Sequence, residues 1–367
     1  MGERSGIDQV IAFYLPQYHP TPENDEWWGP GFTEWTNVAG ARPLYPGHRQ
    51  PNLPGELGFY DLRVPETRAD QAALAASHGV TAFCYWHYWF GDGRRILERP
   101  FAEVLASGEP ALPFCLAWAN DTWRGVWIGA PDRVLIEQTY PGVSDERAHF
   151  ELVVEAFHDP RYLRVDGRPL FAVFNPPALP DAAGFADRWR RWAGEAGLPG
   201  LYLVGLARGS WRASRHGFDA VVMSQVVPPS LERARHERRP LDWVASAVTR
   251  RLPVVPGIYS FDRWSPYVPH LHPDPAEVSF PTVLPGWDNT PRSGRRGFVL
   301  AGSTPGRFAE QVGSARRLLA DRPAGQRLVF VKSWNEWAEG NVLEPDRRHG
   351  RAYLEALRDA LAEVDGA

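Results

Sequence analysis

The stretch LVFVKSWNEWAEG, residues 328–340, begins as a run of apolar residues and ends in polar residues and a glycine. A short apolar run without polar alternation is typical of a strand that is covered on both faces, as in a parallel sheet. Seven further runs of this kind precede it: VIAFYL (10–15), VTAFCYW (80–86), PFCLAW (113–118), LFAVFN (170–175), LYLVGLA (201–207), DAVVMSQ (219–225) and FPTVLPGW (280–287). The chain therefore offers eight candidate strands.

Amphipathic segments lie between these runs. Phe150, Val153 and Phe157 recur at helical spacing, and VPETRAD (64–70) has the proline of a helix start. Strands that alternate with helices in this number predict a (β/α)8 TIM barrel. We expect it to form a single domain over residues 1–367, with a flexible start at 1–8 and long loops at the C-terminal rim.

An open, doubly wound sheet is the alternative, and VVPGIYSF (254–261) could add a strand to the count. Against the open sheet, neither G-x-G-x-x-G nor G-x-x-x-x-G-K-[ST] follows the first run. Residues 16–64 and 226–279 form two long connections. In a barrel, loops at the carboxyl ends of the strands build the active site.

Composition and charge exclude several classes of protein. Hydrophobic residues make up 44% and charged residues 23%, with a net charge of −4, which argues against a nucleic-acid partner. Cys84 and Cys115 lie in apolar runs without ligand-spaced partners, so we predict no metal and no other cofactor. Lys332 is the only lysine, a bias toward arginine that codon usage would explain.

The sequence also shows no recognisable targeting signal. No apolar run reaches the length of a membrane span, and no signal-peptide pattern follows the N-terminus. The expected location is therefore cytoplasmic, unless a leader has been removed.

Tryptophan is abundant, with 16 residues, most of them near strand ends or in the loops that follow. An indole offers a flat apolar face with a polar edge, which matches the C–H face of a sugar. Core packing is the competing explanation for any one ring. It explains the set less well, because Asn120, Asp121 and Asp288 lie beside tryptophans and would match sugar hydroxyls. The pattern predicts an oligosaccharide or polysaccharide substrate.

Glu336 and Glu339 are the strongest catalytic candidates. On a helical turn their Cβ atoms would lie about 5–6 Å apart, and retaining glycosidases hold their two carboxyl groups about 5–5.5 Å apart. Two close carboxylates also separate in pKa, which gives one acid and one base. Helix capping would explain one glutamate but less well both. Glu34 is the next candidate, ahead of Asp121, Asp288 and Glu344.

Six segments together resemble the WbsX-like proteins: AFYLPQYHP (12–20), WWGPGFTEWTNV (27–38), CYWHYWF (84–90), CLAWAND (115–121), PTVLPGWDNTPR (281–292) and SWNEWAEGNVLEPD (333–346). That family is often labelled glycosyltransferase and is related to glycoside hydrolase family 99. The resemblance implies a (β/α)8 barrel without a metal or organic cofactor. Asp121 departs from it, since many WbsX-like proteins have glutamate there.

The resemblance also implies a chemistry, that of retaining, endo-acting α-mannosidases and α-mannanases. By it Glu336 would deprotonate the sugar 2-hydroxyl, which attacks the anomeric carbon to give a 1,2-anhydro sugar. Glu339 would protonate the leaving oxygen and later activate water. Tyr14, His19 and Trp118 resemble residues that line the sugar site. A mechanism through the 2-hydroxyl favours a manno-configured sugar.

The sequence therefore predicts a catalytic barrel, a glycoside hydrolase with catalytic Glu336 and Glu339. The residues expected to bind substrate are Tyr14, His19, Glu34, Trp35, Trp86, His87, Trp118, Asn120, Asp121, Trp287, Asp288, Trp334, Asn335 and Trp337. A glycosyltransferase or transglycosylase of surface-polysaccharide biosynthesis is the alternative, but no Asp-x-Asp motif or glycine-rich phosphate loop supports it. A non-catalytic glycan-binding barrel would not need both glutamates.

Overall fold

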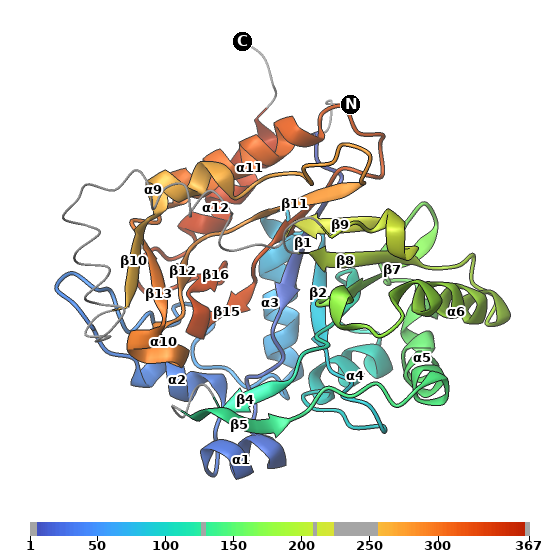
Figure 1. Cartoon of the computed structure of the whole chain (residues 1–367). Coiled ribbons are helices and arrows are strands. Elements are labelled where there is room, and N and C mark those ends of the chain that lie inside the picture. Colours follow the sequence, from blue (N-terminus) through green and yellow to red (C-terminus); the bar gives the residue numbers. More distant parts are fainter. Residues whose placement is uncertain (1–5, 126–129, 208–210, 224–255, 364–367) are drawn as a thin grey trace, which may run out of the picture.

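Eight parallel strands form a closed barrel in the computed structural model, which describes residues 6–125, 130–207, 211–223 and 256–363 (Figure 1). The barrel strands are β1 (Gln9–Tyr14), β2 (Ala82–His87), β3 (Phe114–Trp118), β7 (Arg168–Val173), β8 (Tyr202–Ala207), β9 (Ala220–Met223), β11 (Ser279–Val283) and β14 (Leu328–Val331). Pairing of β3 with β7 and of β14 with β1 closes the ring. The predicted (β/α)8 barrel is confirmed, and each of the eight apolar runs overlaps one of its strands.

The strands lack polar alternation because apolar groups cover both of their faces. Tyr14 of β1 faces outward, where its hydroxyl donates to Gln71 of a covering helix at 2.7 Å. The preceding Phe13 therefore points to the inside. Its ring lies 5.5 Å from that of Phe330 on β14 and 4.9 Å from that of Trp86 on β2. Aromatic rings thus fill the barrel interior.

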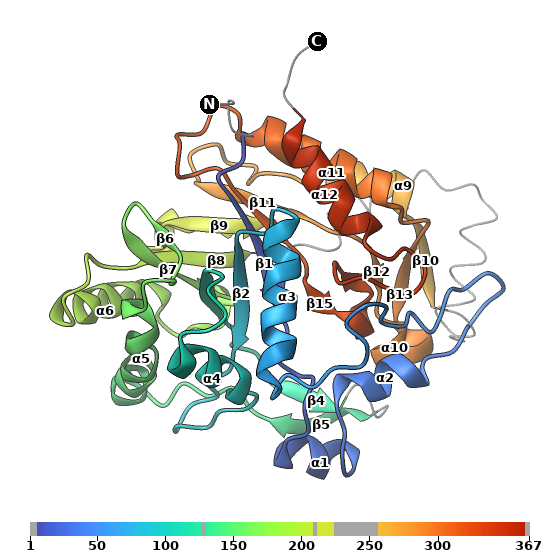
Figure 2. The same cartoon turned by 180° about the vertical axis from the view of Figure 1, so that it is seen from behind.

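Helices cover the outside of the barrel (Figure 2). They are α3 (Pro65–Ser77), α4 (Arg99–Ser107), α5 (Val143–His158), α6 (Ala182–Glu195), α11 (Pro305–Leu319) and α12 (Ala352–Ala362). The predicted stripe of α5 is buried at Phe150, Val153 and Phe157. Thr304 caps α11, because its hydroxyl accepts a hydrogen bond from the Arg307 N–H. None of the helices within the described ranges combines the length and apolar character needed to cross a lipid bilayer.

Short elements occupy the connections between the barrel strands and the covering helices. They are α1 (Pro22–Trp28), α2 (Glu34–Gly40), β4 (Trp123–Gly125), β5 (Ala130–Ile136), β6 (Arg164–Val165), β10 (Gly257–Ser260), α9 (Phe261–Trp264), β12 (Trp287–Asp288), α10 (Thr290–Ser293), β13 (Phe298–Ala301), β15 (Asn335–Glu336) and β16 (Asn341–Val342). The possible ninth strand at 254–261 is β10, which pairs with β13 outside the barrel. Of the long connection at 226–279, residues 226–255 lie outside the described residues.

Four of these short elements meet at one side of the barrel. The helix α2 follows β1, α10 follows β11 and the hairpin β15–β16 follows β14, and these three strands are neighbours in the order β1, β14, β11. Figures 1 and 2 both show α2, α10 and β15 close together. The carboxyl ends of adjacent strands therefore bring residues 34, 292 and 336–339 into one place.

Candidate active site

Both glutamates lie on the hairpin that follows β14. Glu336 ends β15 and Glu339 ends a single 3-10 turn, Trp337–Glu339, before β16 begins. The Ser333 hydroxyl fixes the hairpin, because it accepts from the Glu336 N–H at 3.0 Å and donates to the Asn341 carbonyl at 2.8 Å. Gly340 closes the turn at a φ of 66°. This 3-10 turn stands in place of the helical turn that the sequence suggested, and both glutamates lie on one hairpin.

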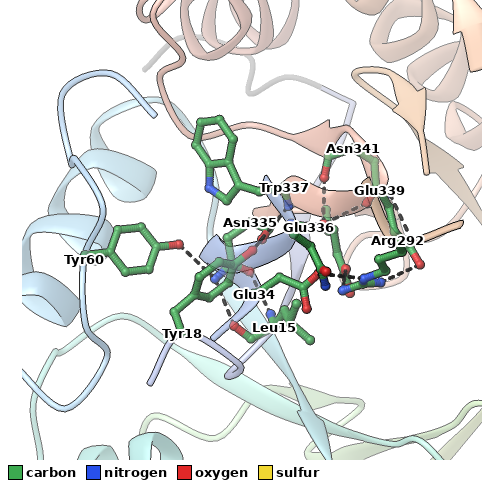
Figure 3. A network of polar contacts seen from close by, with 12 residues as sticks. Leu15, Tyr18, Glu34, Tyr60, Arg292, Asn335, Glu336, Trp337, Glu339 and Asn341 are labelled. Carbon is green, nitrogen blue, oxygen red and sulfur yellow. Dashed lines mark hydrogen bonds and ion pairs between the residues drawn. The ribbon is translucent and has the colours of Figure 1, made fainter. Parts of the chain in front are cut away.

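Arg292 of α10 joins three carboxylates (Figure 3). Its Nη1 donates to Glu339 Oε1 at 2.7 Å and its Nη2 donates to Glu336 Oε2 at 2.9 Å. The Nε donates to Glu34 Oε1 at 2.8 Å, and the Glu34 side chain is completely buried. One guanidinium therefore holds the predicted pair together with Glu34, the carboxylate ranked next.

Asp288 positions the short helix that presents Arg292. Its Oδ1 accepts from the Thr290 N–H at 3.0 Å, in the first turn of α10. Its Oδ2 accepts from Gln50 Nε2 at 2.7 Å and lies 2.8 Å from His48 Nε2. The Leu44 N–H donates to His48 Nδ1, which leaves Nε2 as the protonated nitrogen of the neutral ring. Asp288 thus ties the first long connection to α10, and its oxygens are occupied by protein donors.

The two glutamates differ in pKa because their electrostatic surroundings differ. Burial raises the pKa of Glu336 to about 7, from an ordinary value of 4.5, and the charges of Glu339 and Glu34 add to this against the opposing effect of Arg292. Burial acts on Glu339 in the same sense, but Arg292, Lys332 and a hydrogen bond from Asn341 together bring its pKa below the ordinary value. At neutral pH Glu339 is ionised, whereas Glu336 is close to half protonated.

Tyr88, directly after β2, contributes a further hydroxyl near the acids. Burial raises its pKa, with Glu336, Glu34 and Glu339 adding to the rise and Arg292 opposing it. Its ring packs edge-on to Trp123 at 5.3 Å between centroids. Neither Tyr88 nor Arg292 was selected from the sequence. Arg292 stood within the segment 281–292 that supports the family resemblance, and that is the signal that could have found it.

The other motif residues hold the hairpin rather than line the site. Asn335 is fully buried; its Oδ1 accepts from the Leu15 N–H at 2.7 Å and its Nδ2 donates to the Leu15 carbonyl at 3.0 Å. Trp337 Nε1 donates to Glu344 Oε2 at 2.6 Å. Trp334 is fully buried against Phe83. The expectation that Trp334, Asn335 and Trp337 contact substrate does not fit these positions, because all three side chains are buried inside the protein.

Trp118, His87 and Tyr14 point to the outside of the barrel. Trp118 packs edge-on to His149 of α5 at 4.7 Å between ring centroids, and its Nε1 donates to the Trp89 carbonyl. His87 lies 2.9 Å from the same His149, nitrogen to nitrogen, and burial lowers its pKa to about 3. Side chains of a strand alternate between its faces, and these three lie on the helix-covered one. Their expected place in a sugar site is therefore corrected.

Trp35 and Asn120 are likewise structural. Trp35 is buried between Tyr18 and Tyr60, and its Nε1 donates to the Tyr60 carbonyl at 2.8 Å. Asn120 joins two loops, because its Oδ1 accepts from the Asn175 N–H at 2.7 Å and its Nδ2 donates to the Asn175 carbonyl at 2.9 Å. These contacts leave no polar atom of either side chain for a ligand without rearrangement.

The remaining candidates differ in position. Trp86 is half-buried on the inner face of the barrel, stacked on Phe13. Asp121 is exposed, and its carboxylate accepts from the adjacent Thr122 N–H. Burial lowers the pKa of His19, and within the described residues its Nδ1 has no hydrogen-bond partner. Trp287 is 8% exposed, between Phe298 and Lys332.

Comparison with known proteins gives the family. The family described as Glycosyltransferase WbsX matches residues 10–357. The chain belongs to the WbsX family. It is 41% identical over 362 residues to the uncharacterized protein WxcX of Xanthomonas campestris pv. campestris, a match that covers 97% of this chain and 50% of WxcX. This WbsX-family chain thus spans about half the length of the curated relatives it matches.

Solved structures agree with the fold of this WbsX-family chain. A glycoside hydrolase-like protein superposes with a TM-score of 0.60 at 15% identity, over 99% of this chain and 96% of the other. The family 99 endo-alpha-mannosidase of Bacteroides thetaiotaomicron, in complex with bis-tris-propane, gives 0.57 at 15% identity, over 96% of each chain. The chain therefore has a glycoside hydrolase-like barrel. In the part of it that the structure describes, no group of three or more His, Cys, Asp or Glu side chains could hold a metal ion.

Proposed function

We propose that this protein is a retaining, endo-acting glycoside hydrolase that cleaves a polysaccharide or glycoconjugate at a manno-configured sugar. The observation that supports this most is the contact of Glu336 and Glu339 with one guanidinium at the carboxyl end of the barrel strands. Two adjacent carboxyl groups of different proton affinity can serve as acid and base on one glycosidic bond. The mannosidase named among the similar folds favours the manno configuration.

We assign the proton-donating role to Glu336 and the base role to Glu339. Glu336 holds its proton to about pH 7, so it can protonate the leaving oxygen as the glycosidic bond breaks. Ionised Glu339 can take the proton of the 2-hydroxyl, whose oxygen attacks the anomeric carbon. In the second step ionised Glu336 takes a proton from water, whose oxygen opens the 1,2-anhydro sugar at the anomeric carbon, and Glu339 returns its proton to the 2-oxygen. Two inversions at the anomeric carbon give overall retention. The family resemblance implies the reverse roles, and kinetics can distinguish the two assignments.

Variants E336Q and E339Q provide the test. On a glycan with a poor leaving group, each should lose about 10²–10⁴-fold in kcat, and the losses should not multiply in the double variant. An activated aryl leaving group should restore the first step of E336Q but not of E339Q. E310Q is a matched control, because Glu310 is an exposed glutamate on α11.

Product stereochemistry completes the experiment. NMR early in the reaction should show that the first product has the anomeric configuration of the substrate. Rescue of E339Q instead of E336Q would restore the roles implied by the resemblance. Inversion, or nearly unchanged rates in both variants, would refute a retaining hydrolase that works through this pair.

A transferase is the second candidate, because the matching family is described as a glycosyltransferase. The same acid pair could pass a glycosyl group to a sugar hydroxyl in place of water. Incubation of the protein with a manno-oligosaccharide at high concentration, with products analysed by mass spectrometry, distinguishes the two. Longer oligosaccharides would indicate transfer, and only shorter ones would indicate hydrolysis.

A further inference from the structure

Lys332 is the single lysine in a chain with 40 lysine and arginine residues. An arginine-rich codon usage accounts for the scarcity of lysine but not for the place of the one that remains. That place is the first residue after β14, four positions before Glu336. Residues just beyond the carboxyl end of a barrel strand are the ones that reach the active site of this fold.

Within the described parts of the chain, the contacts of Lys332 leave its charge unpaired. Its backbone N–H donates to the Val283 carbonyl of β11 at 3.0 Å, so the barrel fixes its position. Its Nζ lies 5.3 Å from the ring centroid of Trp287, a cation–π contact, and Trp287 in turn stacks on Phe298. Among the described residues the ammonium has neither a hydrogen bond nor an ion pair, although the side chain is half-buried.

The second cation described at the site, Arg292, already has carboxylate partners. Arg292 donates to Glu34, Glu336 and Glu339 at once. The charge of Lys332 also acts on Glu336 and Glu339, lowering the pKa of each, so it lies within electrostatic reach of the acid pair. In the described structure Lys332 has no carboxylate partner, so its charge is available to an anion that enters the site.

Lysine and arginine would behave differently at this position. A guanidinium is a planar fork that pairs with carboxylates through two parallel hydrogen bonds. An arginine at position 332 could bind Glu336 or Glu339 itself and compete with Arg292. A compact ammonium seated on Trp287 keeps its three donors for another group.

We propose that Lys332 binds an anionic group of the ligand, a carboxylate or a phosphate, beside the glutamate pair. A half-buried charge without a counter-ion gains most from a ligand that brings one. In a glycan the anion would be the carboxylate of an acidic sugar, and in an activated sugar it would be the phosphate. That the ligand is a glycan or an activated sugar rests on the proposed function.

A single lysine makes the test direct. Protein produced without a lysine-containing tag, in medium with ¹³Cε-labelled lysine, should give one ε-methylene NMR signal, and K332R should abolish it. The probes are a mannuronate oligosaccharide, the same oligosaccharide after chemical reduction of its carboxyl groups, and inorganic pyrophosphate. We expect the signal to shift in a saturable way with the first probe or with the third, and not with the reduced oligosaccharide.

The outcomes separate the sources of the anion. A shift with mannuronate identifies a carboxylate ligand, and a shift with pyrophosphate identifies a phosphate ligand. Equal shifts with the acidic and the reduced oligosaccharide, or no shift with any probe, would overturn the proposal. The readout is binding, so it stands even if E336Q and E339Q refute the hydrolase.

Affinity measurements give a second readout. K332M should bind the acidic probe about 10- to 100-fold more weakly, the range for a lost hydrogen bond to a charged group. It should bind the carboxyl-reduced probe as the native protein does. R351M is the matched control, because Arg351 is an exposed cation paired with Glu56. A similar loss of affinity in R351M would mean that net charge, not Lys332, attracts the anion.

Discussion

At the scale of single residues, Arg292 controls the pKa values of the two candidate acids, Glu336 and Glu339. Its charge lowers the pKa of both Glu336 and Glu339. In R292M both pKa values should therefore rise, and both limbs of the pH profile of kcat/KM should move to higher pH by about one unit or more. This direction holds whichever glutamate is the acid.

The control for this prediction is R292K. Lysine keeps the positive charge but cannot donate to three carboxylates from one plane. Its pH profile should stay closer to that of the native protein, while kcat falls because the acids are less well positioned. A pH profile of R292M that coincides with the native profile would contradict the electrostatic role of Arg292.

Trp118 and Trp86 form a matched pair of large-to-small substitutions. Trp118 is 4% exposed against α5, so Trp118→Ala should lower the free energy of unfolding by about 3–5 kcal/mol. Trp86 is half-buried on the inner barrel face, so Trp86→Ala should cost less stability and reduce glycan binding more. Urea unfolding and isothermal titration of the two variants would check this, and the reverse order of effects would contradict it.

The sequence predicted single residues with mixed success, for a physical reason. Glu34, Glu336 and Glu339 were chosen for their chemistry and lie together on Arg292. Trp118 was chosen for its ring, but a strand run that is apolar on both faces does not tell which residues point inward. Arg292 is not among the predicted residues because arginine is common in this chain, and only the segment 281–292 of the family resemblance distinguishes this one.

At the scale of elements, Gly340 determines how Glu339 is presented. Its φ is 66°, and a Cβ atom on it would lie 2.7 Å from the Asp288 backbone nitrogen. Gly340→Ala should therefore push the hairpin away from the segment that leads into α10. We expect a loss of stability of about 1–3 kcal/mol and a fall in kcat/KM of about 10²-fold.

The variant Gly58→Ala separates the effect of backbone strain from the effect of a steric clash. Gly58 has nearly the same φ, 64°, but nothing would lie within 4 Å of its added Cβ. This control should lose stability in thermal melts without a comparable loss of activity. Equal activity losses in both variants would show that the contact with Asp288 does not position Glu339.

Long elements were predictable and short ones were not. A barrel strand or a helix such as α11 shows itself through an apolar run or a helical stripe. The elements that build the site, α10 and the hairpin β15–β16, have two to four residues each, too few for any periodicity. Only tertiary contacts define them, and these join segments that are far apart in the sequence.

At the scale of the whole molecule, Glu344 connects the candidate active site to the packing of the barrel. This carboxylate is 3% exposed and accepts hydrogen bonds from Tyr60, Gln71 of α3 and Trp337. It links the helical layer to the hairpin of the two glutamates. Burial raises its pKa to about 7, above the ordinary 4.5, and the hydrogen bonds only partly offset that rise.

The raised pKa of Glu344 predicts a pH dependence with a definite sign. Between pH 4.5 and about 7 the folded protein keeps a proton on Glu344 that the unfolded chain has lost. The stabilising contribution of protonated Glu344 to the free energy of unfolding is therefore present in full at low pH and is lost as the pH rises through about 7. The loss amounts to about 3 kcal/mol for this difference in pKa. E344Q does not titrate, so its unfolding free energy should fall less over this range. Urea unfolding of both proteins from pH 5 to 8 measures the difference, in which the similar contribution of Glu336 cancels. Parallel curves would mean that Glu344 titrates alike in the folded and unfolded states.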